Sequence, residues 1–298
     1  MKWLLLLVSI LSGSAKSILS KRVNNNAKGL KQTMLANVGL FFFAFCFVGV
    51  FAIFSVQEFC LPWGLTVAYA VCVLLSQIAL MKAVELGSVA ISSLFYSCGF
   101  IIPTIWGCIY FQEGINALHI IGIVLILASF IVSVEKKEDK PFNWKWLIAA
   151  LGGTLFSGLV GVVQKLFGAQ AIEYSLDLFL CTSFAIIILL SGAIFFALYI
   201  FARKEPVLST VEKRKIDIKT LGFTALLGVA MGGVNKLNTY LASVLPSVIM
   251  FPTTNGGVIV ATACFSALLY REKLSKKQIV SILIGFVAIV VIAVGQNI

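Results

Sequence analysis

Lysine and amide side chains lie inside long apolar stretches of this chain, where they could bind a polar solute. Lys16 falls late in the first apolar stretch, and Lys236 follows Asn235 near the end of a later one. An ionisable group inside a membrane costs about 2.5–3.5 kcal/mol on insertion scales, so it is a candidate functional residue. The alternative for both lysines is a snorkelling side chain that places its ammonium group at the membrane surface.

Related polar positions recur in the two halves of the sequence. When the two halves are aligned by the interval that separates Glu113 from Glu272, Gln77 corresponds to Lys236 and Tyr96 corresponds to Asn255. Pro252 and two glycines flank Asn255; together they can kink and loosen a helix, although small residues also serve close helix packing. Broken helices at corresponding depth indicate a binding site in membrane proteins that are built from repeats. The candidate substrate-binding residues are Lys16, Gln77, Tyr96, Ser97, Asn235, Lys236 and Asn255.

The composition is that of an integral membrane protein. Hydrophobic residues make up 60% of the chain and charged residues 12%, whereas globular domains have about 45–50% and about 25%. The apolar runs are about twenty residues long, which predicts helices that cross a bilayer rather than barrel strands. The basic residues that give the chain its net charge of +11 lie mostly in the connections between apolar runs. This location favours anionic lipid head groups over nucleic acid as their binding partner.

An internal repeat predicts the architecture. Residues 86–134 and 245–294 each contain an apolar helix, a short elbow with a glutamate, and a second apolar helix. We expect an all-α polytopic membrane protein of ten transmembrane helices, with five in residues 1–137, a charged linker at 138–143, and five in 144–298. Because five is odd, the repeats must be inverted, with a site at their interface near the midplane. The expected spans are about 3–19, 34–54, 62–84, 86–110, 120–134, 144–166, 176–201, 220–241, 247–270 and 278–294.

The first apolar stretch has an alternative interpretation as a signal peptide, because a basic start precedes an apolar core and small residues. Against this, its Ser12-Gly13 recurs as Ser157-Gly158 in the first apolar stretch of the second half.

These motifs resemble the drug/metabolite transporter superfamily in its ten-helix, EamA-like branch. The resemblance is carried by Ser157-Gly158 with the following Lys165, and by Gly122 after Glu113. It implies a secondary transporter of a small polar metabolite that works by alternating access in the plasma membrane. It also implies that helices one to four and six to nine line the cavity, with helices five and ten at the periphery. Ser281 replaces the corresponding glycine in the second half.

The expected substrate is an amino acid, a sugar or a related neutral, zwitterionic or anionic solute. Small multidrug members of the superfamily carry a glutamate in helix one, but here the comparable residues are Ser12-Gly13-Ser14, which argues against a proton-coupled exporter of cationic drugs. The alternatives are an intramembrane enzyme that acts on lipid-type substrates and a membrane receptor that does not transport. We expect no enzyme activity, no cofactor and no nucleic-acid partner; membrane lipid is a partner, and a homo-oligomer is compatible with the sequence.

Charge distribution and family resemblance disagree about orientation. Nearly all Lys and Arg residues fall on the face of the first, third, fifth, seventh and ninth connections. Basic short loops stay cytoplasmic, so this bias puts both termini outside the cytoplasm, whereas related transporters are usually described with cytoplasmic termini. We favour the charge bias. We also expect Glu113 and Glu272 to cap the helices that follow them, and Lys165 to anchor the end of its helix.

Overall fold

Every regular element is helical in the part of the chain that the computed structural model describes, residues 2–24, 30–55, 60–133, 143–170, 173–203, 218–270 and 275–295. The helices of the first half are α1 (Lys2–Asn24), α2 (Leu30–Ser55), α3 (Trp63–Leu86), α4 (Val89–Ser97), η1 (Cys98–Phe100), α5 (Ile101–Tyr110) and α6 (Ala117–Ser133). Those of the second half are α7 (Trp144–Ala169), α8 (Leu176–Arg203), α9 (Ile218–Val244), α10 (Ser247–Tyr270) and α11 (Lys276–Gly295). Glu272 and the predicted linker, apart from Asn143, lie outside the described residues.

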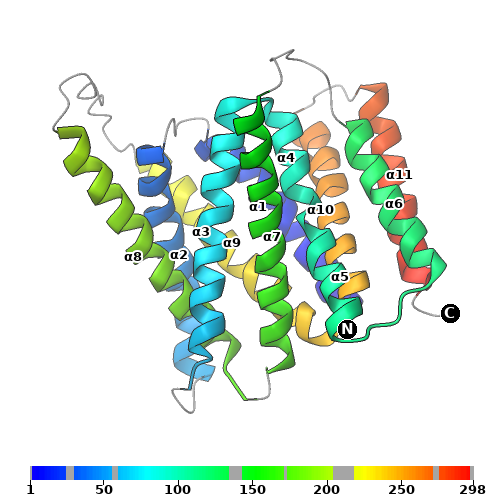
Figure 1. Ribbon diagram of the computed structural model, residues 1–298, viewed down its shortest axis with the longest axis horizontal. Coiled ribbons are helices and arrows are strands. Elements are labelled where there is room, and N and C mark those ends of the chain that lie inside the picture. The colour runs from blue at the N-terminus through cyan, green and yellow to red at the C-terminus, as the bar shows by residue number, and fades with distance from the viewer. Residues whose placement is uncertain are drawn as a thin grey trace.

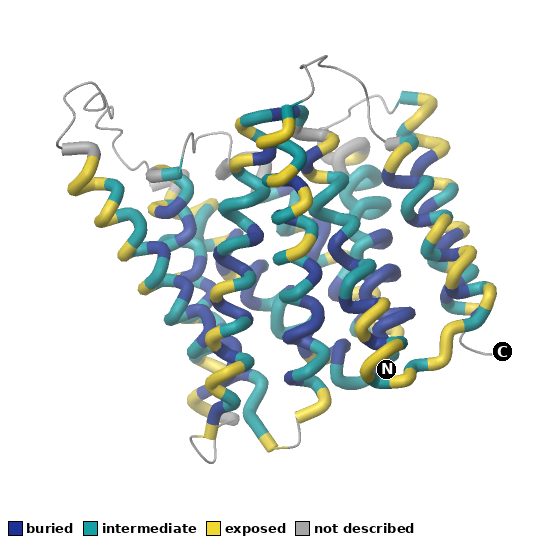
Figure 2. The backbone as a smooth tube through the Cα atoms, in the orientation of Figure 1, coloured by how far each residue is buried: buried dark blue, intermediate teal, exposed yellow. Residues whose placement is uncertain are grey.

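The helices identify a polytopic helical membrane protein. Within the described residues, eight helical spans are long and apolar enough to cross a membrane, and α6 is a shorter apolar helix. Large apolar side chains are exposed along the outer helices, as Ile53, Leu189 and Leu283 show; such side chains suit a lipid-facing surface. In Figure 2, exposed stretches lie along the outer helices, and buried stretches lie where helices face one another. The predicted spans coincide with described helices to within about five residues at either end, but α6 and α9 are not among the eight spans that could cross a membrane.

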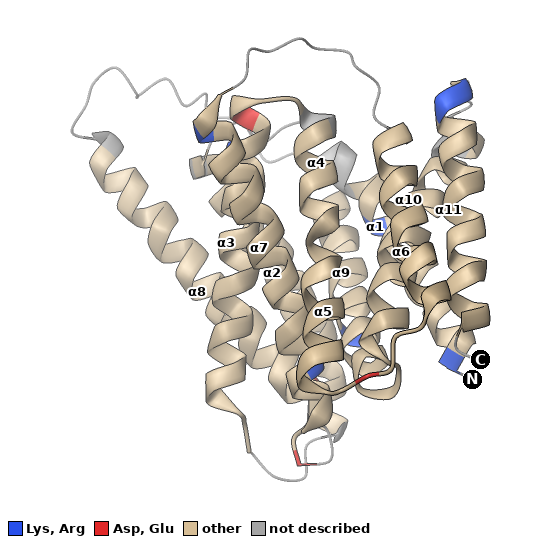
Figure 3. Ribbon diagram, turned by 45° about the vertical axis from the view of Figure 1, so that its right-hand side comes forward, with Lys and Arg blue, Asp and Glu red and all other residues tan. Residues whose placement is uncertain are grey.

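The helices form one bundle with a pair at its edge (Figure 1). The antiparallel helices α6 and α11 pack against each other there, in the peripheral place that the resemblance implies. The helices α2 and α8 pack together on the opposite side of the bundle, and both ends of the chain lie on one face. Most of the described ribbon carries no charge (Figure 3), as expected for segments buried in lipid.

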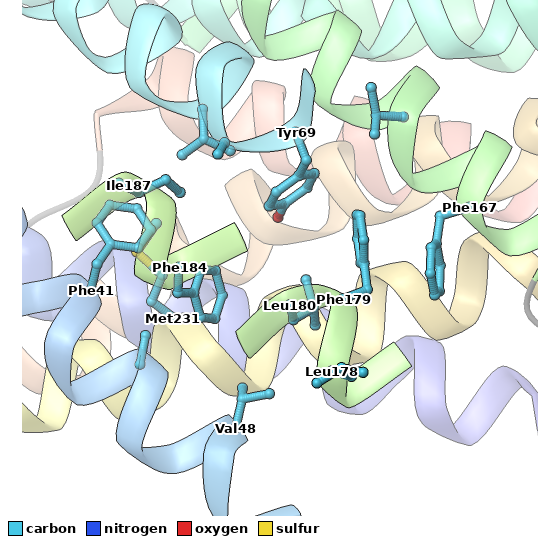
Figure 4. Close-up of a cluster of buried hydrophobic side chains, with 14 of the residues drawn as sticks. Phe41, Val48, Tyr69, Phe167, Leu178, Phe179, Leu180, Phe184, Ile187 and Met231 are labelled. Atoms are coloured by element: carbon cyan, nitrogen blue, oxygen red, sulfur yellow. The ribbon is translucent and has the colours of Figure 1, made fainter. Parts of the chain in front are cut away.

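A cluster of aromatic and aliphatic side chains fills the space between α2, α3, α7, α8 and α9 (Figure 4). The rings of Phe167 and Phe179 stack with centroids 4.1 Å apart. The ring of Tyr69 meets Phe179 edge-on at 5.4 Å. Such ring geometries are favourable beyond the area that they bury, so these contacts fix the orientation of the Tyr69 hydroxyl at the border of the cluster.

The fourth predicted span is broken into α4, a short 3₁₀ turn and α5. Pro103 has no N–H to donate to the carbonyl of Gly99; in the 3₁₀ turn the N–H of Ile101 instead donates to the carbonyls of Cys98 and Gly99. The span approaches α7 closely at this point, since a Cβ on Gly99 would lie 2.9 Å from the carbonyl oxygen of Thr154. By contrast, α10 continues as an α-helix through Pro252, so only the first of the two related spans is interrupted.

The first helix packs as a member of the bundle, between α9 and α10. The hydroxyl of Ser9 donates to the side-chain oxygen of Asn238 at 2.5 Å. Near the start of the helix, the ammonium of Lys2 donates to the carbonyl of Val244 at 3.1 Å. One turn beyond Ser9, a Cβ on Gly13 would meet Val258, so the absence of a side chain allows α1 to approach α10 closely.

Candidate functional site

Polar side chains from both halves meet inside the bundle. The hydroxyl of Tyr69 on α3 donates to the amide oxygen of Asn235 on α9 at 2.7 Å, and the neighbouring side chain of Gln164 comes from α7. The amide of Gln164 in turn donates to Thr239, one turn beyond Asn235, at 3.2 Å. These bonds place an amide pair and a phenol at the junction of α3, α7 and α9, deep among apolar side chains.

A second group of polar atoms continues from this junction. The hydroxyls of Ser76 on α3 and Tyr96 on α4 lie 3.4 Å apart, and Ser157 on α7 donates to the carbonyl of Tyr96 at 3.0 Å. We call Tyr69, Ser76, Tyr96, Gln164, Asn235 and Thr239 the interhelical polar cluster.

The interhelical polar cluster consists of uncharged side chains, and its six hydroxyls and amides offer both donors and acceptors. A membrane bundle gains affinity between helices from such bonds, so they also contribute to packing. If a solute bound there, hydrogen bonds between protein groups would be replaced by hydrogen bonds to the solute. The net free-energy change of that replacement would be close to zero, because each bond lost is matched by a bond gained. The arrangement is therefore suited to reversible binding of a polar molecule.

Two of the predicted binding residues, Asn235 and Tyr96, belong to the cluster, and Gln77 follows its member Ser76 on α3 with intermediate burial. Ser97 and Asn255 bond back along their own helices, to the carbonyls of Ser93 and Phe251. Lys16 has intermediate burial on α1, which does not contribute to the cluster. The structure thus brings together some of the predicted residues and leaves the others apart.

Lys236 lies on another face of α9 from Asn235, as expected for adjacent residues that point about 100° apart. Its ammonium is 2.7 Å from the carboxylate of Asp177, in the first turn of α8. It also lies 3.8 Å from the centre of the Phe51 ring on α2, within the range of a cation–π contact. The charge of Lys236 is therefore balanced at the junction of α2, α8 and α9, outside the interhelical polar cluster.

Sequence reasoning missed Tyr69, Gln164, Thr239 and Asp177 as members of these polar contacts. Gln164 is only 5% exposed, although the sequence suggested a helix end at the membrane surface. Asp177 stands three residues after Tyr174 at the start of an apolar run, and this acidic residue at the beginning of a membrane helix was the available signal. Tyr69 gives no signal of its own, because one tyrosine in an apolar helix is compatible with any face.

The described residues contain no group of three or more His, Cys, Asp or Glu side chains that could hold a metal ion. The seven cysteines are all free thiols.

The helical arrangement matches that of an experimentally determined structure. A solved structure described only as "Crystal structure of protein" superposes with a TM-score of 0.75 at 12% sequence identity, over 98% of this chain and 98% of its own. At that identity the likeness shows the fold alone. No protein-family model matches the chain, and no curated protein matches it in sequence.

Proposed function

We propose that this protein is a secondary transporter of a small polar metabolite and that it works by alternating access between two inverted five-helix repeats. In this proposal α4, η1 and α5 together form one of ten spans, and the EamA-like resemblance of the sequence supports the same arrangement. The single observation that carries the proposal is the interhelical polar cluster. It joins side chains from α3 and α4 of the first half to side chains from α7 and α9 of the second.

The position of the cluster suits alternating access. A solute bound there would contact both halves at once, and a change in their relative position would alter its access to either face. The wall combines two phenols with two amides, which suits a solute that carries hydroxyl, amide or amino groups.

The charges around the site favour a neutral or zwitterionic solute among the substrates expected from the sequence. Lys165 pairs with Glu113 at 2.7 Å, and Lys236 pairs with Asp177 at the same distance. Both ammonium groups are thus balanced by carboxylates. An anionic metabolite would have to displace a carboxylate that is already in place, at the cost of leaving it unpaired.

Transport is tested by counterflow of labelled metabolites into proteoliposomes that contain the purified protein. The panel should include amino acids, sugars, nucleosides and organic acids. We expect exchange of at least one neutral or zwitterionic solute, with little exchange of organic acids. If no solute in a broad panel exchanges while the reconstituted protein stays monodisperse, the transporter proposal is wrong.

The assignment of the site is tested by removing one hydroxyl. Tyr69→Phe keeps the ring that packs on Phe179 and removes the donor to Asn235, so we expect about a tenfold lower counterflow rate at subsaturating substrate, equivalent to about 1.4 kcal/mol. Tyr110→Phe is the matched control, because Tyr110 is 61% exposed at the end of α5. Equal rates for the two variants would remove Tyr69 from the site.

A further inference from the structure

Three segments that are distant in sequence are tied together by Glu113 at the face that holds the chain termini. Its carboxylate lies 2.7 Å from the ammonium of Lys165, near the end of α7. It also accepts the backbone N–H of Ser247, the first residue of α10, at 2.6 Å. Lys165 completes the connection by donating to the carbonyl of Leu245, in the turn between α9 and α10, at 2.9 Å. We call Glu113, Lys165, Leu245 and Ser247 the Glu113 latch.

The carboxylate thus caps a helix of the opposite half. The prediction that Glu113 caps the helix that follows it is wrong, because Asn116 takes that role: its side-chain oxygen accepts the N–H of His119 at 3.0 Å in the first turn of α6. Glu113 instead compensates the free N–H groups and the positive dipole end of α10.

The local backbone is built for this contact. Gln112 adopts a positive φ of 52°, an uncommon conformation for a residue other than glycine. The N–H groups of Phe111 and Glu113 both donate to the carbonyl of Gly107, at 3.1 and 3.3 Å, which folds the chain tightly after α5. A Cβ on Gly107 would collide with the side chains of Ser247 and Glu113. The glycine is therefore required for α5 to approach α10.

The ion pair is shielded, since the side chains of Lys165 and Glu113 are only 11% and 12% exposed. Removing one partner of a buried pair leaves the other charge without compensation, which costs much more than the net value of the pair. A buried pair of this kind is therefore well suited to define two discrete arrangements, one joined and one separated. The Lys82–Glu85 pair, at 2.8 Å within α3, differs in both respects: its side chains are 47% and 36% exposed, and it joins residues of one helix.

We propose that the Glu113 latch closes the pathway between the halves at the face of the chain termini and that it must separate when that face opens. The geometry supports this because the connection joins the loop after α5 in the first half to α7 and the α9–α10 turn in the second. Gln164, a member of the interhelical polar cluster, precedes Lys165 on α7, so a movement of this part of α7 displaces both side chains. This proposal rests on the proposed alternating access, since a closure has a role only if the halves move.

The experiment measures access to the cluster without any substrate. Thr239→Cys introduces a thiol at a position that is 0% exposed, in a variant whose seven native cysteines are replaced by alanine or serine. Alkylation by a membrane-impermeant maleimide is followed in right-side-out and inside-out vesicles. We expect Glu113→Ala and Lys165→Ala to raise the labelling rate about tenfold or more from the face of the termini only, because a loss of 1.4 kcal/mol in closure corresponds to tenfold.

Glu85→Ala is the matched control, because it removes a glutamate that also pairs with a lysine but within one helix; its labelling rate should equal that of the parent. Glu113→Gln retains an oxygen that can accept the Ser247 N–H and should give an intermediate labelling rate. This variant can be used for the test if an alanine variant fails to fold. Unchanged labelling in the folded Glu113 and Lys165 variants would overturn the latch, and so would an equal rise from both faces. A failed counterflow assay alongside one-sided labelling would instead refute the transport proposal and leave the closure intact.

Discussion

Lys236 and Asp177 form an ion pair that gives Lys236 a structural role beside the binding role predicted from the sequence. The two side chains are 30% and 11% exposed, so the pair is only partly desolvated. Lys236→Ala would leave the Asp177 carboxylate without its ammonium. Loss of transport in this variant alone would therefore not distinguish substrate binding from damage to the junction of α2, α8 and α9.

A double variant separates the two roles. We expect Lys236→Ala to lower the free energy of unfolding by about 2 kcal/mol, below the 3–5 kcal/mol of a fully buried pair, and Lys236→Ala/Asp177→Asn to recover most of that loss. Thermal unfolding of the purified variants measures the stability, and counterflow measures transport. If the stable double variant regains transport, Lys236 acts only through the pair; if it remains inactive, Lys236 contacts the substrate.

At the scale of elements, the contact between the broken span and α7 depends on residues without side chains. A Cβ on Gly99 would meet the Ser157 hydroxyl and the Thr154 carbonyl. We expect Gly99→Ala to lower the free energy of unfolding by about 1–3 kcal/mol through overpacking. Gly192→Ala on α8 is the control, because no atom lies within 4 Å of a Cβ there; it should stabilise the helix by about 0.5–1 kcal/mol. Thermal unfolding in detergent tests both, and a lower unfolding temperature for the control would contradict the packing argument.

The positions of the helices could be predicted from the sequence, whereas their contacts could not. Ser247 and Trp144 begin helices as predicted, because hydropathy and turn residues report directly on where the chain enters lipid. An apolar helix is hydrophobic on all sides, so its pattern does not show which face meets which neighbour. For that reason Asn235 was identified as a candidate, but its partner Tyr69 was not.

The break at Pro103 shows the same limit. The sequence suggested a kink at Pro252, yet α10 continues through that residue and the interruption lies in the related span, which contains Pro103. Proline is tolerated inside a membrane helix where neighbouring groups satisfy the freed carbonyl. Whether they do depends on tertiary packing, which no local sequence signal records.

At the scale of the whole molecule, the common location of the two termini gives a direct test of orientation. Both ends of the chain lie on the same face of the bundle (Figure 1), so one reporter decides the matter. The bias of Lys and Arg toward the opposite face predicts termini outside the cytoplasm. A C-terminal fusion to a reporter that folds only in the cytoplasm should therefore be inactive, and a periplasmic or extracellular reporter should be active. Cytoplasmic activity would show that the family resemblance, rather than the charge bias, gives the orientation.

The edge pair of α6 and α11 has a mechanical consequence. The pair is tied along its length: Asn116 donates to the carbonyl of Gly295 at 2.6 Å, and the hydroxyls of Ser129 and Ser281 each donate to the other residue's carbonyl, at 2.8 and 2.9 Å. One helix comes from each half, and hydrogen bonds of this length tolerate only small shifts. If the halves rotate against each other, the rotation axis must therefore pass close to this pair. Displacements of one half against the other then grow with distance from that edge.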